Sequence, residues 1–435
     1  MARFGLPKIM KPPEWGIEPV KSEYRYLGFL DYFVLWSSLS VGLLVFWAGS
    51  LLVPALDLKS ALLAIVLGTI IGNLPLAFVG LIGSECAIPT MVTVRPSFGI
   101  RGSYLPTALN VLQLVGWTAF EIIVMARAAD TIVTSVFGYS SFNLWVVFFA
   151  FICAAMAIGG PLLVIRQWLE RFAIWIVYGT SVWIAYSITA GQDLWRLLSI
   201  HPEGGISLLY AIDLVVAMPI SWMPLVADYG RFAKDPKASL LGTYSGYFLG
   251  NVMFYGLGAL SVLALGAADP IAAIAAIAFG IPALTLILVD ETDNGFADIY
   301  SAAVSIQNIS SRFKQWTLII AISFVGMILA LVVPMDQYSW FLLWIGAVFI
   351  PLFGVVIIDY YLVRSRRYRI EELYRLKGEY WYSRGVNPRA VLAWAIGVVT
   401  YFYIVNYASW LGASIPSLVV SAIVYLMVTK LWKID

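Results

Sequence analysis

The sequence predicts an all-α protein that crosses a membrane twelve times. Of its 435 residues, 61% are hydrophobic and only 12% are charged, whereas a soluble domain carries about 25% charged residues. Twelve apolar stretches recur along the chain, and each is long enough to cross a bilayer core as a helix of about 20 residues. Short segments that are charged or contain Pro and Gly separate these stretches. Together these observations indicate a polytopic membrane protein.

The bounds of the twelve expected helices are taken from the ends of the apolar stretches. A polar, basic tail occupies 1–27. A first group of five helices fills 28–190, a second group of five fills 207–362, a basic loop covers 363–386, and two more helices fill 387–431. The individual spans are expected at 28–54, 60–82, 103–136, 142–163, 169–190, 207–229, 238–266, 281–307, 315–334, 338–362, 387–408 and 411–431.

Basic residues are distributed asymmetrically between the loops expected on the two sides of the membrane. With both termini inside, 24 of the 27 Lys and Arg residues fall in inside loops and tails. Only Lys59 and Arg196 fall outside, and Arg127 lies within a span. An excess of Lys and Arg marks the cytoplasmic side of membrane proteins. We therefore expect a multi-pass protein of a plasma or inner membrane, with both termini in the cytoplasm.

The net charge and a few single residues exclude several classes of function. The net charge is only +2 and the basic residues are dispersed, so we expect no nucleic-acid partner. Cys86 and Cys153 lie in apolar surroundings without metal-ligand spacing, and we expect both to be reduced. The single histidine, His201, falls in an expected external loop, and no nucleophile–base motif is present. We therefore expect neither an enzyme nor an organic cofactor.

The stretch VDETDNGFAD at 289–298 places four acidic residues in an apolar region. It forms either a solvated loop or part of a helix at membrane depth. A loop would divide 281–307 into pieces too short to span and would reverse the charge asymmetry downstream. At about 100° per residue, Asp290, Glu291, Asp293 and Asp298 share an arc of roughly 160°. We therefore expect a helix whose acids face the protein interior, where acidic residues tend to mark functional sites.

Glu121 lies in the middle of the third expected helix. No charged residue lies three or four positions from it. Trp117 precedes it by four residues, so the two side chains share one helix face. An aromatic ring beside a buried acid suits a planar polar ligand. The alternative is a structural hydrogen bond to another helix.

The first and sixth expected helices contain features that interrupt helices. The first carries WSSLSVGLLVFWAGS, with Gly42 midway, and the sixth carries VAMPISWMPLVADYGRF, with Pro219 and Pro224. Proline removes an amide donor, and freed backbone groups at membrane depth line a protein cavity. Interruptions at corresponding places in two halves point to the central site of a transporter. They favour alternating access over the other possibility, a receptor or channel without transport.

Three long motifs identify a family. They are TVRPSFGIRGSYLPTALNVLQLVGW at 93–117, SWMPLVADYGRFAKDPKAS at 221–239 and IDYYLVRSRRYRIEELYRLKGEYWYSRGVNPRA at 358–390. In these motifs the chain resembles the nucleobase:cation symporter-1 family, the permeases for cytosine, purines, uracil, thiamine and allantoin. The resemblance covers nearly the whole chain. VAMPISWMPLVADYGRFAK and YSAAVSIQNI are most similar to the branch for cytosine or hydroxymethylpyrimidine.

The resemblance implies a LeuT-like fold and a cation site. The fold is a five-plus-five inverted repeat with two added C-terminal helices, and it works by alternating access, here as a monomer. The cation would lie between helices one and eight. Backbone carbonyls of Ser38, Val41 and Val289 would bind it, together with side-chain oxygens of Thr292 and Asp293. Oxygen ligands around unwound backbone suit Na⁺.

The resemblance also implies a substrate site between helices one, three, six and eight. Trp117 matches a tryptophan that stacks on the substrate. Pro219 stands where relatives carry an aromatic residue, and Trp222 follows three positions later. The expected substrate-binding residues are Gly42, Trp117, Glu121, Pro219, Ser221, Trp222 and Asp298.

Acids replace neutral groups of the family pattern at Glu121, Asp293 and Asp298. An ionised carboxylate only accepts hydrogen bonds, so these positions favour a substrate rich in N–H donors or a cation such as thiamine. Alternatively, one acid carries a proton and the coupling ion is H⁺. We expect Na⁺- or H⁺-coupled import of cytosine or a related aminopyrimidine. The alternatives are hydroxymethylpyrimidine or thiamine, and a purine or allantoin. Asp290 and Glu291 match no ligand position.

Overall fold

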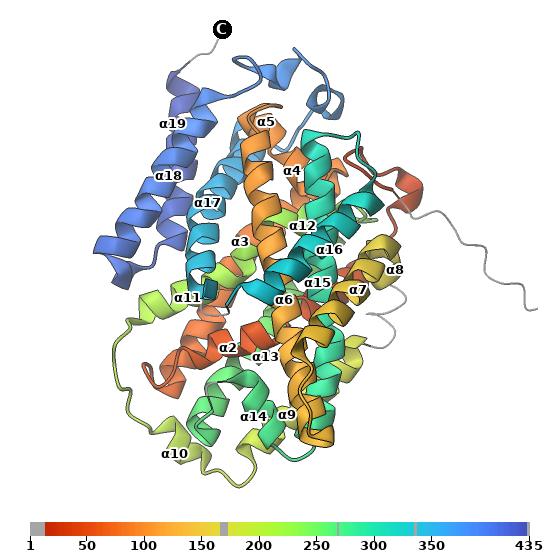
Figure 1. Cartoon of the computed structure of the whole chain (residues 1–435). Helices are drawn as coiled ribbons and strands as arrows, with labels where there is room; N and C mark the ends of the chain where they lie inside the picture. Colours follow the sequence, from red (N-terminus) through yellow and green to blue (C-terminus); the bar gives the residue numbers. More distant parts are fainter. Residues whose placement is uncertain (1–13, 166–172, 268, 335–336, 433–435) are drawn as a thin grey trace, which may run out of the picture.

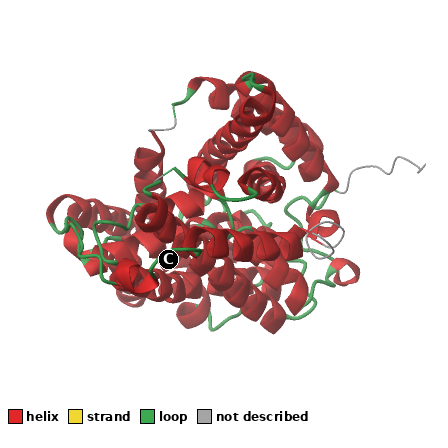
Figure 2. Cartoon of the chain, turned by 90° about the horizontal axis from the view of Figure 1, so that it is seen from below, coloured by secondary structure: helices red, strands yellow, loops and turns green. Residues whose placement is uncertain are grey.

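The computed structural model describes residues 14–165, 173–267, 269–334 and 337–432, and these fold into helices and short connections (Figure 1, Figure 2). No strand is named within these ranges. The helices are α1 Phe29–Ser38, α2 Leu43–Ser50, α3 Leu58–Cys86, α4 Thr90–Thr93, α5 Arg95–Phe98, α6 Tyr104–Phe137, α7 Phe142–Gly159, α8 Pro161–Leu163, α9 Ile174–Thr189, α10 Leu194–Leu198, α11 Leu208–Ser221, α12 Met223–Gly230, α13 Pro236–Leu265, α14 Pro270–Ala276, α15 Gly280–Ile309, α16 Gln315–Val332, α17 Tyr338–Ile358, α18 Pro388–Tyr407 and α19 Ser414–Leu431.

The described part of the chain contains nine helices that are long and apolar enough to cross a membrane. The bent pair of α1 and α2, at 60° to each other, makes a tenth span if the two count as one. The all-helical, multi-span fold is thereby confirmed. Two further expected spans fall on α9, with 16 residues, and on α15, with 30 residues. The expected start of the fifth helix, at 169, lies outside the described residues. The count of twelve stays a prediction.

The helices pack in three groups. In one, α1 lies along α13, and α3 packs against α11, α12 and α13. In the second, α15 packs against α6, α7 and α16. The third contains α17, α18 and α19, which lie together at one side of the molecule (Figure 1). The two broken helices, α1–α2 and α11–α12, therefore belong to one group, and the acidic helix α15 belongs to another.

Glycines allow α13 to lie directly on α1. A Cβ atom at Gly246 would overlap the backbone of Phe33, and one at Gly250 would lie 2.6 Å from the Ser37 carbonyl oxygen. Small residues let helix backbones approach closely in a membrane, where packing rather than the hydrophobic effect drives association. The first half of the broken first span is thus fixed by a flat, side-chain-free surface of α13.

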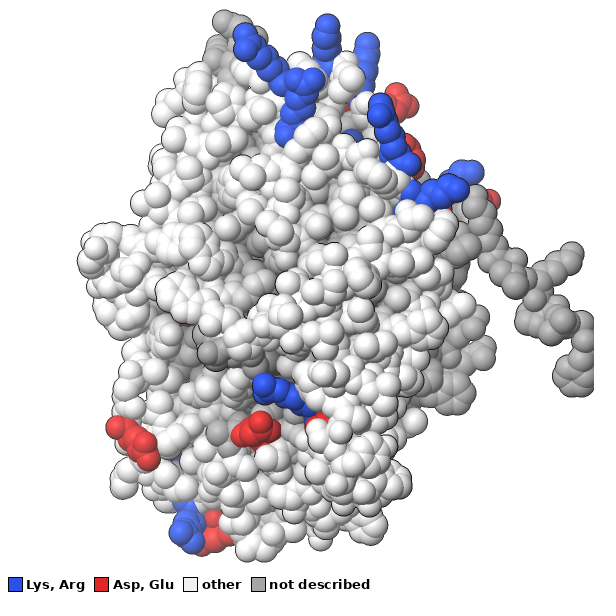
Figure 3. All heavy atoms as spheres, in the orientation of Figure 1, with Lys and Arg blue, Asp and Glu red and all other residues white. Residues whose placement is uncertain are grey.

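Lys and Arg side chains gather at one end of the molecule, and most of the surface between the two ends carries no charge (Figure 3). Part of this charged end is the segment after α17. There Arg364 pairs with Glu379 at 2.6 Å, and Arg366 pairs with Glu85 of α3. The arrangement agrees with the expected asymmetry of basic loops, and the uncharged band suits the hydrocarbon core of a bilayer.

The acidic stretch 289–298 lies within the continuous helix α15, so the prediction of a helix rather than a loop is confirmed. All four acids are buried: Asp290 and Glu291 are 1% exposed, Asp293 is 0% and Asp298 is 3% exposed. They face the protein interior, as their shared arc predicts.

Candidate functional site

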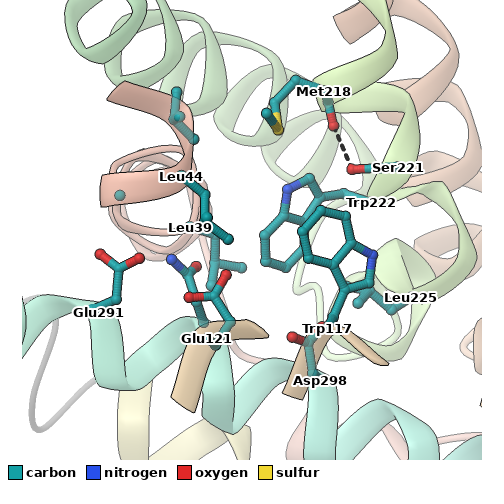
Figure 4. A pocket seen from close by; sticks show the side chains of 13 residues that line it. Leu39, Leu44, Trp117, Glu121, Met218, Ser221, Trp222, Leu225, Glu291 and Asp298 are labelled. Carbon is teal, nitrogen blue, oxygen red and sulfur yellow. Dashed lines mark hydrogen bonds between the residues drawn. The ribbon is translucent and has the colours of Figure 1, made fainter. Parts of the chain in front are cut away.

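A cavity lies where both broken helices meet α6 and α15 (Figure 4). The cavity has a volume of about 30 Å³, so the helices enclose little more than the space of a few water molecules. The lining comes from helices that are far apart in the sequence. It consists of Leu39, Gly42, Leu44, Val45, Trp117, Glu121, Met218, Ser221, Trp222, Leu225, Glu291, Asn294 and Asp298.

Six of the seven residues expected at the substrate site line this one cavity: Gly42, Trp117, Glu121, Ser221, Trp222 and Asp298. Pro219 is the exception. Its ring packs toward α3, where a Cβ atom at Gly72 would lie 2.5 Å from the Pro219 Cγ. Its expected place at the substrate is therefore not supported, because Pro219 occupies the α11–α3 contact. Whether the other six bind substrate stays a prediction.

Two indole rings stand together on one side of the cavity (Figure 4). Trp222 sits at the junction of α11 and α12, and its ring meets Trp36 edge-on, with centroids 6.0 Å apart at 89°. Trp117 of α6 meets Phe341 edge-on, with centroids 5.4 Å apart at 74°. Trp222 thus brings a second aromatic ring to the cavity from the sixth span, although Pro219 occupies the family's aromatic position.

The cavity also contains three acids, and the sequence interpretation assigned no role to one of them. Glu121 lines the cavity and is 5% exposed, and its Oε2 atom has no hydrogen-bond partner among the described residues. Glu291 lies close enough to Glu121 for the charges of their carboxyl groups to interact. Asp298 is the third. Because Glu291 and Asp298 are seven residues apart, two helical turns place them on one face of α15. This seven-residue spacing is the feature of the sequence from which a role for Glu291 in the cavity could have been predicted.

Glu291 also holds the break in the first span. The backbone N–H of Leu43, the first residue of α2, donates to both carboxylate oxygens of Glu291, at 3.2 and 3.3 Å. A carboxylate at a helix N-terminus satisfies free amides and interacts favourably with the helix dipole. Gly42 leaves room for this contact. A Cβ atom there would lie 3.1 Å from Glu291 Oε1 and 3.3 Å from Asn294 Nδ2.

The expected cation ligands lie on the other side of the same break. The Ser38 hydroxyl donates to Asp290 Oδ1 at 2.7 Å, and Asn294 Nδ2 donates to the Val41 carbonyl at 3.4 Å. Asp293 is fully buried, and neither of its carboxylate oxygens has a hydrogen-bond partner among the described residues. Ser38 and Asp290 thus join α1 to α15 beside Asp293. The sequence signal for Asp290 was its position three residues before Asp293.

Thr292 and Val289 are oriented differently. The Thr292 hydroxyl donates to the Val289 carbonyl at 2.7 Å within α15, so these two expected ligands are bonded to each other. Both residues also line an apolar groove between α6, α7 and α15, and Val289 is 41% exposed. This bond uses the hydroxyl hydrogen of Thr292 and one lone pair of the Val289 carbonyl, so both oxygens keep a lone pair for a cation. Across the part of the chain that the structure describes, no group of three or more His, Cys, Asp or Glu side chains is placed to hold a metal ion.

Comparison with known proteins places this geometry among transporters. Residues 19–432 match the model of a family described as permease for cytosine/purines, uracil, thiamine, allantoin. The hydantoin permease of Microbacterium maritypicum is 27% identical over 88% of this chain and 83% of its own length. The cytosine permease of Escherichia coli K12 is 28% identical over 85% and 83%. These relatives are permeases and not enzymes.

Solved structures show the same fold. The transporter Mhp1 of the nucleobase-cation-symport-1 family, in a closed conformation with bromovinylhydantoin bound, superposes with a TM-score of 0.86. It is 23% identical, and the match covers 96% of this chain and 95% of that one. A Na⁺-coupled sialic acid symporter, substrate-bound and outward-open, superposes with a TM-score of 0.71 at 12% identity, covering 96% and 93%.

Proposed function

Because this chain belongs to the family of permeases for cytosine/purines, uracil, thiamine and allantoin, we propose that it imports a nucleobase-like heterocycle by cation-coupled alternating access. Cytosine or a related aminopyrimidine is the first candidate substrate. The observation that carries the proposal is the single cavity in which Trp117 and Trp222 stand beside Glu121 and Asp298. Indole faces suit a flat heterocycle, and carboxylates accept hydrogen bonds from its N–H groups.

The position of the cavity supports alternating access. It lies between the packed group of α1, α3, α11, α12 and α13 and the group of α6, α7, α15 and α16. Rocking of one group against the other would open the cavity to one side of the membrane at a time. We propose a monomer as the functional unit. The basic end lies in the cytoplasm together with both termini.

We propose that the coupling ion is Na⁺, bound at the break of the first span. Asp293 supplies two unpaired oxygens there, and the backbone carbonyls of Ser38 and Val41 lie on the unwound segment or next to it. H⁺ is the second candidate, because carboxyl groups at this depth can take up a proton. The neutral side chains that relatives carry at the same positions cannot.

A binding screen on the purified protein tests the substrate class. Cytosine, hydroxymethylpyrimidine, thiamine, hypoxanthine and allantoin are compared by thermal shift, with and without Na⁺. We expect stabilisation by an aminopyrimidine that increases with Na⁺. Counterflow in proteoliposomes then separates transport from sensing, because a sensor binds ligand but does not exchange it across a membrane. Absence of binding by every heterocycle in the panel contradicts the proposal.

A further inference from the structure

The charge of the cavity is the strongest property that the proposed function leaves unexplained. Glu121, Glu291 and Asp298 bring three carboxyl groups to it, and none of the described residues that line it is Lys, Arg or His. Asp298 lies near enough to Glu121 for their charges to interact. A buried carboxylate without a positive partner is costly in a protein interior. The residues that line the cavity supply no such partner, so either a proton or a positively charged ligand offsets this cost.

Two of these acids are also positioned to bind a ligand. Glu291 keeps its position through the Leu43 amide, while Oε2 of Glu121 is buried in the cavity wall without a hydrogen-bond partner among the described residues. The indole rings of Trp117 and Trp222 line the same space. Aromatic faces attract a cation through their negative π-electron density. Carboxyl groups and indole faces in one cavity therefore both favour positive charge.

We propose that the substrate binds as a heteroaromatic cation, with its positive charge paired to Glu121 and Glu291 and its ring against the two tryptophans. This inference rests on the proposed function and adds the charge of the substrate to it. It gives Glu291 a second role besides capping α2. It also accounts for an acid at Glu121, because a neutral amide at this position would offer a neutral heterocycle both donors and an acceptor.

Two ligands of nearly identical shape separate charge from fit. 4-Aminopyridine is protonated at neutral pH, whereas 4-aminopyrimidine, which differs by one ring nitrogen, is mainly neutral. Binding of both to the purified full-length protein is measured at pH 7 by calorimetry. N1-methyl-4-aminopyridinium, whose charge is permanent, excludes proton exchange as the source of the difference. We expect the two cations to bind at least about tenfold more tightly than the neutral ring, which corresponds to about 1.4 kcal/mol.

The variants Glu291→Gln and Glu121→Gln test the residues. Each removes one charge and keeps an oxygen acceptor, and we expect each to reduce the preference for the cations by about tenfold. Glu203→Gln makes the same change at an exposed position and should leave the preference unaltered. If Glu291→Gln disturbs the Leu43 cap and fails to fold, Glu121→Gln still measures how far the preference for cations depends on the acids of the cavity.

The outcomes keep this inference distinct from the function on which it rests. Equal or tighter binding of the neutral ring overturns the charge assignment and leaves the permease function intact. The same holds if both Gln variants keep the wild-type preference. If neither ring binds and the heterocycle panel also fails, the proposed function itself falls.

Discussion

The carboxylate of Glu291 on α15 accepts the backbone N–H of Leu43 at 3.2 and 3.3 Å and so caps the second half of the broken first span. The contact joins residues 248 positions apart. It also connects the two proposed sites. Gly42 on one side of the contact lines the proposed substrate cavity, and Asp290, next to Glu291, accepts a hydrogen bond from Ser38. Movement of the broken helix would therefore affect both proposed sites together.

Removal of the Glu291 acceptor should destabilise the protein. Both Glu291→Ala and Glu291→Gln remove the buried charge, but only Glu291→Ala leaves the buried Leu43 amide without an oxygen acceptor. We therefore expect Glu291→Ala to have an unfolding free energy about 1–3 kcal/mol lower than that of Glu291→Gln. Unfolding curves of the purified variants measure the difference, with Glu203→Ala and Glu203→Gln as exposed controls. Equal stability of Glu291→Ala and Glu291→Gln would show that the cap contributes nothing.

The acids beside Ser38 should determine cation affinity. Asp293→Asn removes a charge from a residue whose oxygens have no partner among the described residues, and we expect Na⁺ to bind at least about tenfold more weakly, a loss of about 1.4 kcal/mol. Asp290→Asn should weaken it by a smaller factor, because the Ser38 hydroxyl already donates to Asp290.

The readout for these variants is the thermal shift that Na⁺ produces, since a ligand that binds only the folded state stabilises it more strongly the further its concentration exceeds its Kd. Choline at equal ionic strength is the ionic control, and Asp269→Asn, a helix cap in α14, is the control variant. A wild-type protein that Na⁺ does not stabilise speaks against a Na⁺ site and for H⁺ coupling.

Gly246 should tolerate no larger residue, because a Cβ atom there would overlap the Phe33 backbone of α1. We expect Gly246→Ala to destabilise the protein by about 1–3 kcal/mol, the range for overpacking. Gly179 in α9 is the matched control, since a Cβ atom there would have no neighbour within 4 Å. Gly179→Ala should be neutral or slightly stabilising. The prediction fails if both alanine variants unfold at the same temperature.

Asp57 should contribute stability only above acidic pH. The Ser60 amide and hydroxyl donate to its carboxylate, each at 2.9 Å, and these bonds lower the pKa of Asp57 from its usual 3.8. Because the folded pKa is the lower one, the stabilisation is complete above the unfolded value and is lost as the pH falls through the folded value. The side chain is only partly buried, so the contribution is small, below about 1 kcal/mol.

Unfolding temperatures of wild type and Asp57→Asn, compared between pH 7 and about pH 3, measure this effect. Asparagine is also a good N-cap but does not titrate, so any gap between the two proteins should narrow toward acid. If the difference in unfolding temperature widens on acidification instead, the ionised form of Asp57 is not the one that stabilises the folded protein.

The sequence allowed the fold to be predicted where the cause is local. Pro and Gly in the first and sixth spans broke those helices as expected, and charge balance alone required the helix through 289–298. The family motifs then indicated six of the residues that line the cavity. Each of these inferences depends on residues near one another in the chain or on summed composition.

Contacts between distant segments could not be predicted in this way. Ser38 and Asp290 meet only because α15 packs into the unwound first span, and neither residue alone indicates the other. Trp222 lies at the one-residue interruption between α11 and α12 and lines the cavity, whereas Pro219, three residues earlier, packs toward α3. Glu291 was within reach of sequence reasoning through its two-turn spacing from Asp298. Its role became evident only from the Leu43 contact.

Uptake of labelled cytosine into proteoliposomes tests the central claim most directly. An imposed inward Na⁺ gradient, an imposed pH gradient and no gradient are compared. The account predicts saturable uptake that the Na⁺ gradient drives, that Trp117→Ala and Glu121→Ala abolish, and that Glu203→Gln retains. Uptake of cytosine and related aminopyrimidines that equals protein-free liposomes under every gradient would contradict it.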